Sequence, residues 1–162
     1  SGLMIVAKNS SSASKWTKLI GSKAVKKEYL ALCTGNIKTK KGMISEDIEQ
    51  HGQIKKAFTN YEVSKEWDID GIHFLLLRLS LDTGRMHQIR IHLAKNGCPI
   101  AGDDLHGNFR LNKILKKNYK IKRLCLAAVK LSFAKEIKDG FSIEIPCPFA
   151  LPEVCFDNSP SL

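Results

Sequence analysis

The densest group of chemically capable side chains lies in Leu81–Gly107, which reads LDTGRMHQIRIHLAKNGCPIAGDDLHG. Directly after an apolar strand pattern, this stretch places Arg85, His87, Gln88 and Arg90 close together. Such side chains donate hydrogen bonds to phosphates, sugar hydroxyls and base edges, which are the groups that a nucleic acid presents. A solvated helix face has a similar composition. The residues alone therefore leave RNA contact and a solvated face open.

The same stretch contains the triplet Asp82-Thr83-Gly84, which also occurs in retroviral-type aspartic proteases. Those enzymes need two aspartates that share one proton, so one copy of the triplet requires a homodimer. The neighbouring Arg85 and Arg90 would favour ionisation of both carboxylates, which that mechanism cannot use. A dimeric aspartic protease using Asp82 is therefore only a remote alternative.

Other motifs predict structure rather than chemistry. The glycine spacing of Gly102–Gly107 matches a phosphate-binding loop, but Asn108 and Phe109 follow where such a loop has Lys and Ser or Thr. The acidic pairs Asp68/Asp70 and Asp103/Asp104 fall in predicted turns, where aspartate is favoured for its hydrogen bonds to the backbone. The five cysteines are dispersed, which supports neither a disulfide framework nor a zinc site. We expect no metal, no cofactor and a reducing, cytoplasmic location.

The charge balance points to a polyanionic partner. The 162 residues include 26 Lys and Arg against 16 Asp and Glu, a formal net charge of +10. Nucleic acid is favoured over an anionic membrane surface for a small basic domain. No apolar run approaches the roughly 20 residues that span a bilayer, so we expect no membrane insertion. Oligomeric state is not predictable from these residues.

The elements that must position these groups follow from hydrophobic periodicity and turn signals. We predict helices over 10–21, 86–96 and around 111–115, and strands over 3–7, 27–34, 57–67, 72–81, 124–133 and 141–145. The polar segment 39–52 receives no assignment. In the strand over 57–67, Tyr61 and Trp67 are predicted to face the same way. The fold class is a single α+β domain with a mixed, mostly antiparallel sheet flanked by a few short helices, spanning 1–156 with a tail over 157–162.

Several blocks of this sequence resemble the motifs of a known family. TGRMHQIRIHLAKNGCPIAGDDLHG is similar to the TGR-S/T-HQ-I/L-R-V-H…G-x-P-I-x-GD-x-x-Y-G block of RluA-type RNA pseudouridine synthases. Further blocks occur in the order of that family: SGLMIVAK at the start, KEYLAL followed by Gly35, KAFTNYEV, RLCLAA, and the closing Phe141 with Pro146-Cys147-Pro148. The resemblance covers nearly the whole chain.

The resemblance implies isomerisation of uridine to pseudouridine in structured ribosomal or transfer RNA, without a cofactor or metal. It gives Tyr29 the role of the tyrosine that lies on the flipped base and takes the C5 proton. It gives Arg90 the role of the arginine that pairs with a nucleophilic aspartate, since a cation within about 4–6 Å keeps a carboxylate ionised. The predicted RNA-binding residues are Arg85, His87, Gln88, Arg110, Lys113 and Lys117.

This chain departs from the family pattern at several positions. Met86 stands for a Thr or Ser, His106 for a Tyr and Ala127 for a His. The nucleophilic aspartate of the family lies four residues before the position of Ser1, so we expect a domain that is truncated at its N-terminus and inactive alone. A non-catalytic RNA-binding module of the same fold is the alternative.

Overall fold

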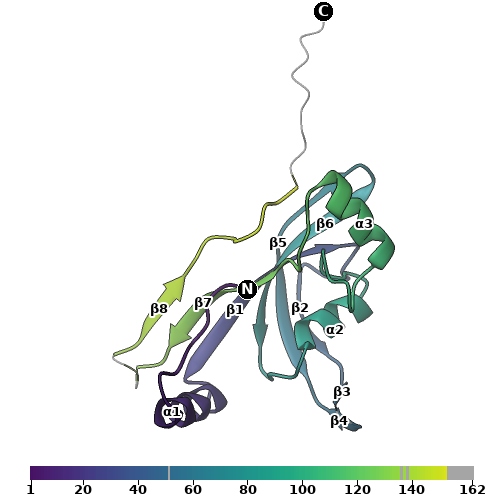
Figure 1. Ribbon diagram of the computed structural model, residues 1–162. Helices are drawn as coiled ribbons and strands as arrows, with labels where there is room; N and C mark the ends of the chain where they lie inside the picture. The colour runs from purple at the N-terminus through teal and green to yellow at the C-terminus, as the bar shows by residue number, and fades with distance from the viewer. Residues whose placement is uncertain (51, 136, 138, 153–162) are drawn as a thin grey trace, which may run out of the picture.

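The structure, a computed structural model, describes residues 1–50, 52–135, 137 and 139–152. Three helices and eight strands are found in this part of the chain (Figure 1). Their bounds are α1 Ser10–Gly21, β1 Val25–Thr34, β2 Lys41–Ser45, β3 Ile48–Gln50, β4 Gln53–Lys55, β5 Phe58–Ile69, β6 Ile72–Leu81, α2 Gln88–Lys95, α3 Phe109–Asn118, β7 Leu126–Phe133 and β8 Phe141–Glu144. Six strands form one sheet in the order β2-β5-β6-β1-β7-β8, all paired antiparallel, and β3 pairs with β4. The predicted α+β architecture is confirmed.

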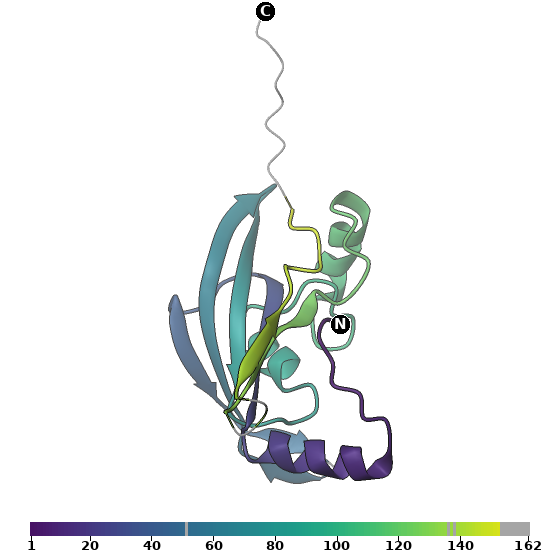
Figure 2. The ribbon, with the colours of Figure 1, turned by 90° about the vertical axis from the view of Figure 1, so that its left-hand side faces the viewer.

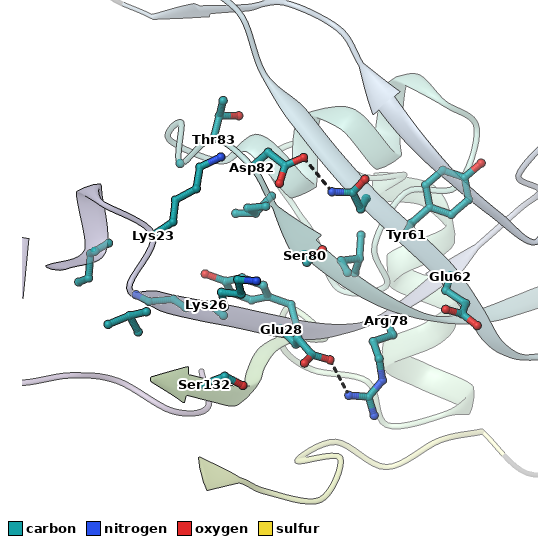
Figure 3. A pocket seen from close by; sticks show the side chains of 18 of the residues that line it. Lys23, Lys26, Glu28, Tyr61, Glu62, Arg78, Ser80, Asp82, Thr83 and Ser132 are labelled. Atoms are coloured by element: carbon teal, nitrogen blue, oxygen red, sulfur yellow. Dashed lines mark hydrogen bonds and ion pairs between the residues drawn. The ribbon is translucent and has the colours of Figure 1, made fainter. Parts of the chain in front are cut away.

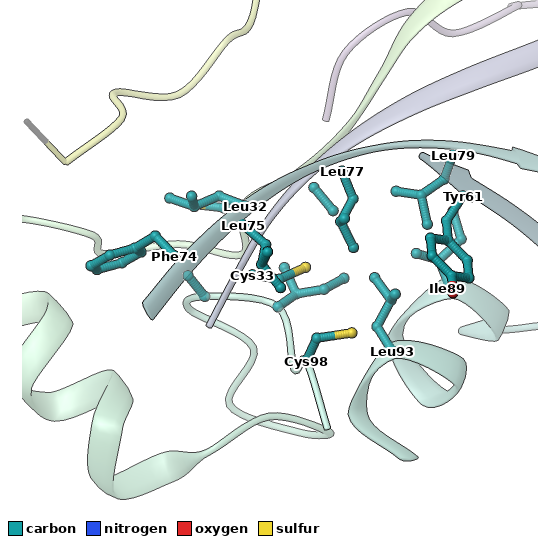
Figure 4. Packing of buried hydrophobic residues seen from close by; sticks show 14 of the residues in the cluster. Leu32, Cys33, Tyr61, Phe74, Leu75, Leu77, Leu79, Ile89, Leu93 and Cys98 are labelled. Atoms are coloured by element: carbon teal, nitrogen blue, oxygen red, sulfur yellow. The ribbon is translucent and has the colours of Figure 1, made fainter. Parts of the chain in front are cut away.

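Two apolar layers cover the two faces of the sheet. The first lies under helices α2 and α3 and contains Ala31, Cys33, Leu75, Leu77, Leu79, Ile89, Leu93 and Leu115 (Figure 4). The second lies under the chain that follows β8 and contains Leu30, Leu76, Ala127 and Val129, with Ile145 and Cys147 packed against them. In β1, Leu30 belongs to the second layer, whereas Ala31 and Cys33 belong to the first. Helix α1 lies at one end of the sheet, away from α3 (Figure 2).

A β-bulge in β5 changes which side chains face each layer. The register between β5 and β6 shifts between Val63 and Lys65, so Trp67 stands opposite Phe74. The two rings stack with their centroids 5.8 Å apart. Our prediction that Trp67 shares the face of Tyr61 was wrong, because one extra residue in a strand inverts the alternation beyond it.

The segment 3–7 is not the buried strand that we predicted. Only Gly2 bridges to the sheet, at Ala128, in the one parallel contact found among the described residues. Leu3 and Ile5 pack against the end of the sheet that α1 covers, whereas the Met4 side chain is 78% exposed. The residues alternate, but the backbone leaves the sheet in order to reach α1.

The other predicted elements mostly form, with some differences at their ends. Helix α2 begins two residues later than predicted, and the unassigned segment 39–52 contains the short strands β2 and β3. The turn between β5 and β6 has positive φ angles at Asp70 (50°) and Gly71 (73°), as two-residue hairpin turns require. The predicted tail 157–162 lies outside the described residues. Within those residues, none of the helices combines the length and apolar character that crossing a membrane would take.

Candidate active site

A cavity of about 1050 Å³ lies where strands β1 and β6 separate. Their ladder runs from Thr34 opposite Phe74 to Glu28 opposite Ser80 and stops there, although β1 begins at Val25. The cavity is lined on both sides of this last pair, by Lys26 and Asp82 beyond it and by Tyr29 and Arg78 within the ladder. Figure 3 shows the Lys23 side chain pointing from one wall toward the Asp82 region of the other. The volume is at the upper end of the range typical of small-molecule sites.

Cationic side chains outnumber carboxylates around this cavity. The charged residues that line it are Lys23, Lys26, Lys27, Lys41, Arg78, Glu28, Glu62 and Asp82. Two of the cations are paired: Lys41 Nζ lies 3.1 Å from Glu62 Oε2, and Arg78 Nη1 lies 3.1 Å from Glu28 Oε2. Such an excess of positive charge in a concave site attracts an anionic ligand.

The paired charges belong to a row that crosses all six strands of the sheet. In the order of the strands, its members are Lys41, Glu62, Arg78, Glu28, Lys130 and Glu144, with alternating signs. Lys130 Nζ lies 3.3 Å from Glu144 Oε2, and the hydrogen bond and charge of Lys130 lower the pKa of Glu144. The Arg78–Glu28 contact joins β6 to β1 directly at the point where the two strands begin to separate.

Tyr29 lines the cavity where β1 and β6 are still paired. It stands in one row with Leu79 of β6 and Ala128 of β7, next to the last paired residue of β1. Its ring packs against the first apolar layer while also lining the cavity. Burial raises the pKa of the Tyr29 phenol, so its hydroxyl is protonated at neutral pH. An aromatic ring that lines a basic cavity can stack on a nucleobase.

Arg90 forms a bidentate ion pair with Asp103, and neither residue lines this cavity. Its Nε and Nη2 donate to the two carboxylate oxygens at 2.8 and 2.7 Å. The Arg90 side chain is 16% exposed and that of Asp103 only 1%. Burial alone would raise the pKa of Asp103, but hydrogen bonds from Arg90, His106 and Leu105 lower it to about 2. Arg90 therefore holds a carboxylate within the described chain, and Nη1 makes no hydrogen bond to a described residue.

The Gln88 side chain is buried and makes its hydrogen bonds within the protein, not at the surface. Its Oε1 accepts hydrogen bonds from the Thr83 hydroxyl at 2.8 Å and the Arg85 backbone at 3.0 Å. Its Nε2 donates to Phe58 O at 2.9 Å and to Thr59 Oγ1 at 3.1 Å. With only 2% of the residue exposed, the Gln88 amide fixes the loop before α2 to β5.

The remaining predicted RNA-binding residues lie on the surface. Arg85 Nε donates to Lys56 O at 3.2 Å, and the Nδ1 atom of His87 lies 3.0 Å from Nε2 of His106. On α3, the exposed side chains of Arg110, Lys113 and Lys117 recur at helical spacing along one side. Lys113 Nζ lies 4.6 Å from the centre of the Phe109 ring.

The N-terminal segment docks on β7, which separates it from Tyr29 of β1. Ala128 donates its backbone N–H to Ser1 O at 3.1 Å and accepts from Leu3 N at 2.8 Å. Gly2 has a φ of +93°, and a Cβ atom there would lie 2.2 Å from Ala128 O. Only glycine fits this approach. Gly2, Ala128 and Tyr29 thus lie in adjacent positions across the sheet.

Sequence reasoning missed two parts of this site. It placed Asp103 in a turn, which is confirmed by hydrogen bonds from Leu105 N and His106 N, but it did not anticipate the ion pair with Arg90. It also missed the lysines of the cavity, because they come from the α1–β1 connection, β1 and β2 and form no local motif. The separation of β1 from β6 brings them together, and no sequence pattern marks that separation.

Comparison with known proteins identifies the family of this chain. The sequence model described as "RNA pseudouridylate synthase" matches residues 1–95. A Bacillus subtilis protein named "Uncharacterized RNA pseudouridine synthase YhcT" is 31% identical over 96% of this chain and 52% of its own length. The "Ribosomal large subunit pseudouridine synthase C" of Rickettsia conorii is 37% identical over 67% of this chain and 39% of its own length. This chain thus spans about half, or less, of the length of these relatives.

Two solved structures of pseudouridylate synthase domains are also similar to this chain. The structure named "Human RNA Pseudouridylate Synthase Domain Containing 1" is similar with a TM-score of 0.70 and 25% identity, covering 90% of this chain and 64% of the other. "Human RNA Pseudouridylate Synthase Domain Containing 4" has a TM-score of 0.66 at 23% identity, covering 90% and 66%. The second likeness shows the shared fold.

Proposed function

Because this chain belongs to the RNA pseudouridylate synthase family, we propose that the protein containing it converts uridines of structured RNA into pseudouridines. The reaction breaks the bond between C1′ and N1, turns the uracil, and joins C1′ to C5, while the C5 proton leaves and N1 gains one. The observation that carries the proposal is the basic cavity that Tyr29 lines. The name of the Rickettsia relative makes large-subunit ribosomal RNA the first substrate to test, ahead of transfer RNA.

Tyr29 is proposed to lie on the flipped base and to take the C5 proton. The uridine must leave its stack to enter the cavity, as in other enzymes that act on a base. Since burial raises the pKa of Tyr29, the phenol enters the reaction protonated. It can then stack and donate a hydrogen bond, and it accepts the C5 proton only after passing on its own. The loss of the hydroxyl is therefore expected to stop the reaction at proton transfer.

Arg90 is proposed to keep the nucleophilic aspartate ionised. The resemblance places that aspartate four residues before Ser1, and four residues of extended chain reach roughly 13 Å. Adjacent strands lie about 4.8 Å apart, so Gly2 and Tyr29, which are separated by β7, have backbones about 10 Å apart. An aspartate at that position can therefore reach Tyr29. The free Nη1 of Arg90 is the proposed donor, since Asp103 already holds the other side of the guanidinium.

RNA phosphates are proposed to bind along the positive surface around the cavity. The contributing residues are the cavity lysines that pair with no described carboxylate, together with Arg85, His87, Arg110, Lys113 and Lys117. Gln88 is left out of this set because its amide is buried and fully used by the chain itself. Since phosphate contacts release counterions, the affinity for RNA is expected to fall steeply as salt rises.

The test is release of tritium from RNA labelled at C5 of uridine, using the full-length protein. We expect turnover by the wild type, none by Tyr29→Phe, and none after Asn replaces the aspartate four places before Ser1, with RNA affinity largely retained in both. Tyr119→Phe is the matched control, because the Tyr119 hydroxyl donates to Asp70 and does not line the cavity. Undiminished turnover by Tyr29→Phe would contradict the role of Tyr29. Salt-sensitive RNA binding without tritium release by the wild type would instead favour the non-catalytic RNA-binding module.

A further inference from the structure

Two histidines form a contact that the proposed chemistry does not use. The Nδ1 atom of His87 lies 3.0 Å from Nε2 of His106, and the rings meet edge to face with centroids 5.1 Å apart. At that distance one ring nitrogen carries a proton and the other accepts it. His106 replaces a tyrosine of the family pattern, so the pair is a feature of this chain.

The backbone of His87 turns its ring toward His106 rather than toward the helix. His87 precedes α2 with a φ of 56° and a ψ of 17°, a left-handed conformation that residues other than glycine adopt rarely. Its side chain makes no capping hydrogen bond to α2. The ring is therefore not explained by helix capping, and its contact is the imidazole of His106.

His106 is fixed by the same carboxylate that fixes Arg90. Its backbone N–H donates to Asp103 Oδ1 at 2.9 Å, while the Asp103 carboxylate also accepts both hydrogen bonds of Arg90. The pair thus has a defined position relative to Arg90. Along the chain, the pair follows the cavity closely, since Gly84, three residues before His87, is one of the lining residues.

We propose that His87 and His106 act together as a phosphate contact for RNA beside the cavity. His87 binds a phosphate oxygen through Nε2, and His106 is the positioning residue that holds the His87 ring through Nδ1. The inference rests on the proposed function, because its ligand is an RNA phosphate.

The charged groups around His106 make its Nε2 the acceptor of this contact. They are Arg90 of α2 and Asp103 of the loop before α3, together with the His87 ring. Burial lowers the pKa of His106, and the cationic Arg90 and the His87 ring lower it further, against the opposing effect of Asp103. In the proposed contact His87 donates Nδ1–H to His106 and Nε2–H to the phosphate, so both of its ring nitrogens carry protons. Charge-assisted hydrogen bonds of this kind are the stronger ones. Because the contact needs this added proton, RNA binding is expected to weaken as the pH rises.

The experiment measures binding of the 162-residue chain to a fluorescent RNA hairpin with uridines in its loop, at pH 6 and pH 8 and constant ionic strength. We expect His106→Phe to weaken binding about tenfold at pH 6, which corresponds to one charge-assisted hydrogen bond, and to flatten the pH dependence. His106→Gln, which restores a polar atom near the place of Nε2, should recover most of the affinity. His73→Gln is the control, because His73 pairs with Asp68 and does not line the cavity.

The outcomes separate this inference from the proposed function. If the wild type shows no salt-sensitive RNA binding at either pH, the proposed function fails. If it binds RNA with salt sensitivity but His106→Phe has the same affinity and pH dependence as the wild type, only the histidine pair is refuted. Should His106→Phe not fold, His87→Asn gives the same test, because asparagine tolerates the left-handed backbone and is too short to reach His106.

Discussion

Replacing Asp103 with asparagine tests whether the Arg90–Asp103 pair organises the site. The buried carboxylate accepts four hydrogen bonds, two from Arg90 and two from the backbone N–H groups of Leu105 and His106. Asparagine retains one acceptor oxygen for the backbone but turns an NH₂ group toward the guanidinium. Two sets of donors then face each other, and the charge of Arg90 loses its partner.

The expected loss follows from the pKa of Asp103. A folded-state value of about 2, against an ordinary value near 3.9, corresponds to about 2.5 kcal/mol of stability at neutral pH. No reduction for solvent screening applies, because the Asp103 side chain is 1% exposed. Breaking a buried pair by removing one partner typically costs about 3–5 kcal/mol. Since Arg90 keeps some contact with solvent, we expect a loss of about 3 kcal/mol for Asp103→Asn, which lowers Tm by about 6–12 °C in a chain of this size.

Urea unfolding at pH 7, repeated down to pH 2, measures both parts of this reasoning. Because the pKa of Asp103 is lower in the folded state, its contribution is present above about pH 4 and is lost as pH falls toward 2. Asp103→Asn should lack that part of the acid-induced loss. The matched control is Asp104→Asn at the neighbouring exposed residue, which accepts one hydrogen bond from Asn112 at 3.1 Å and should cost less than about 1 kcal/mol. A loss below about 1 kcal/mol for Asp103→Asn, or an unchanged acid profile, would refute the reasoning.

Three further predictions address the loop before α2, the N-terminal segment and the buried thiols. Gln88→Leu should lower the free energy of unfolding by about 2–4 kcal/mol, because it leaves several buried polar groups without partners. A variant that unfolds like the wild type but binds RNA less well would instead support a direct contact between Gln88 and RNA. Gly2→Ala should detach the first residues from β7, which hydrogen exchange would detect as rapid exchange of the amides of Leu3 and Ala128. In the control Gly21→Ala, the added Cβ meets no atom within 4 Å, so the exchange of these amides should not change. Burial raises the pKa of Cys98 to about 12 and that of Cys33 well above its usual value. Iodoacetamide at pH 8 should therefore label these two thiols only in urea. Labelling of either thiol in the native chain would show that this part of the core opens.

The elements with strong periodicity could be predicted from sequence, and the site could be predicted only in part. Helix α1 and the β5–β6 hairpin follow from local patterns, since an apolar stripe and a turn with Gly71 specify them without tertiary information. Tyr29 and Arg90 were singled out through the family resemblance rather than from their own surroundings. The bulge beyond Val63 left no such signal, and neither did the separation of β1 from β6 that creates the cavity. Both depend on how strands are paired, which one strand's sequence does not encode.

The two roles of Arg90 determine how the catalytic proposal has to be tested. A change at Arg90 removes the proposed partner of the nucleophile, but it also leaves Asp103 buried with an unpaired charge. Any loss of turnover would then combine chemistry with a displaced loop. Tyr29 offers the cleaner experiment, because its hydroxyl makes no hydrogen bond to a described residue while its ring packs against the core. Phenylalanine keeps that packing and deletes only the proton-carrying group. A folded Tyr29→Phe protein that binds RNA but releases no tritium therefore assigns the lost step to the hydroxyl, which no substitution of Arg90 can do.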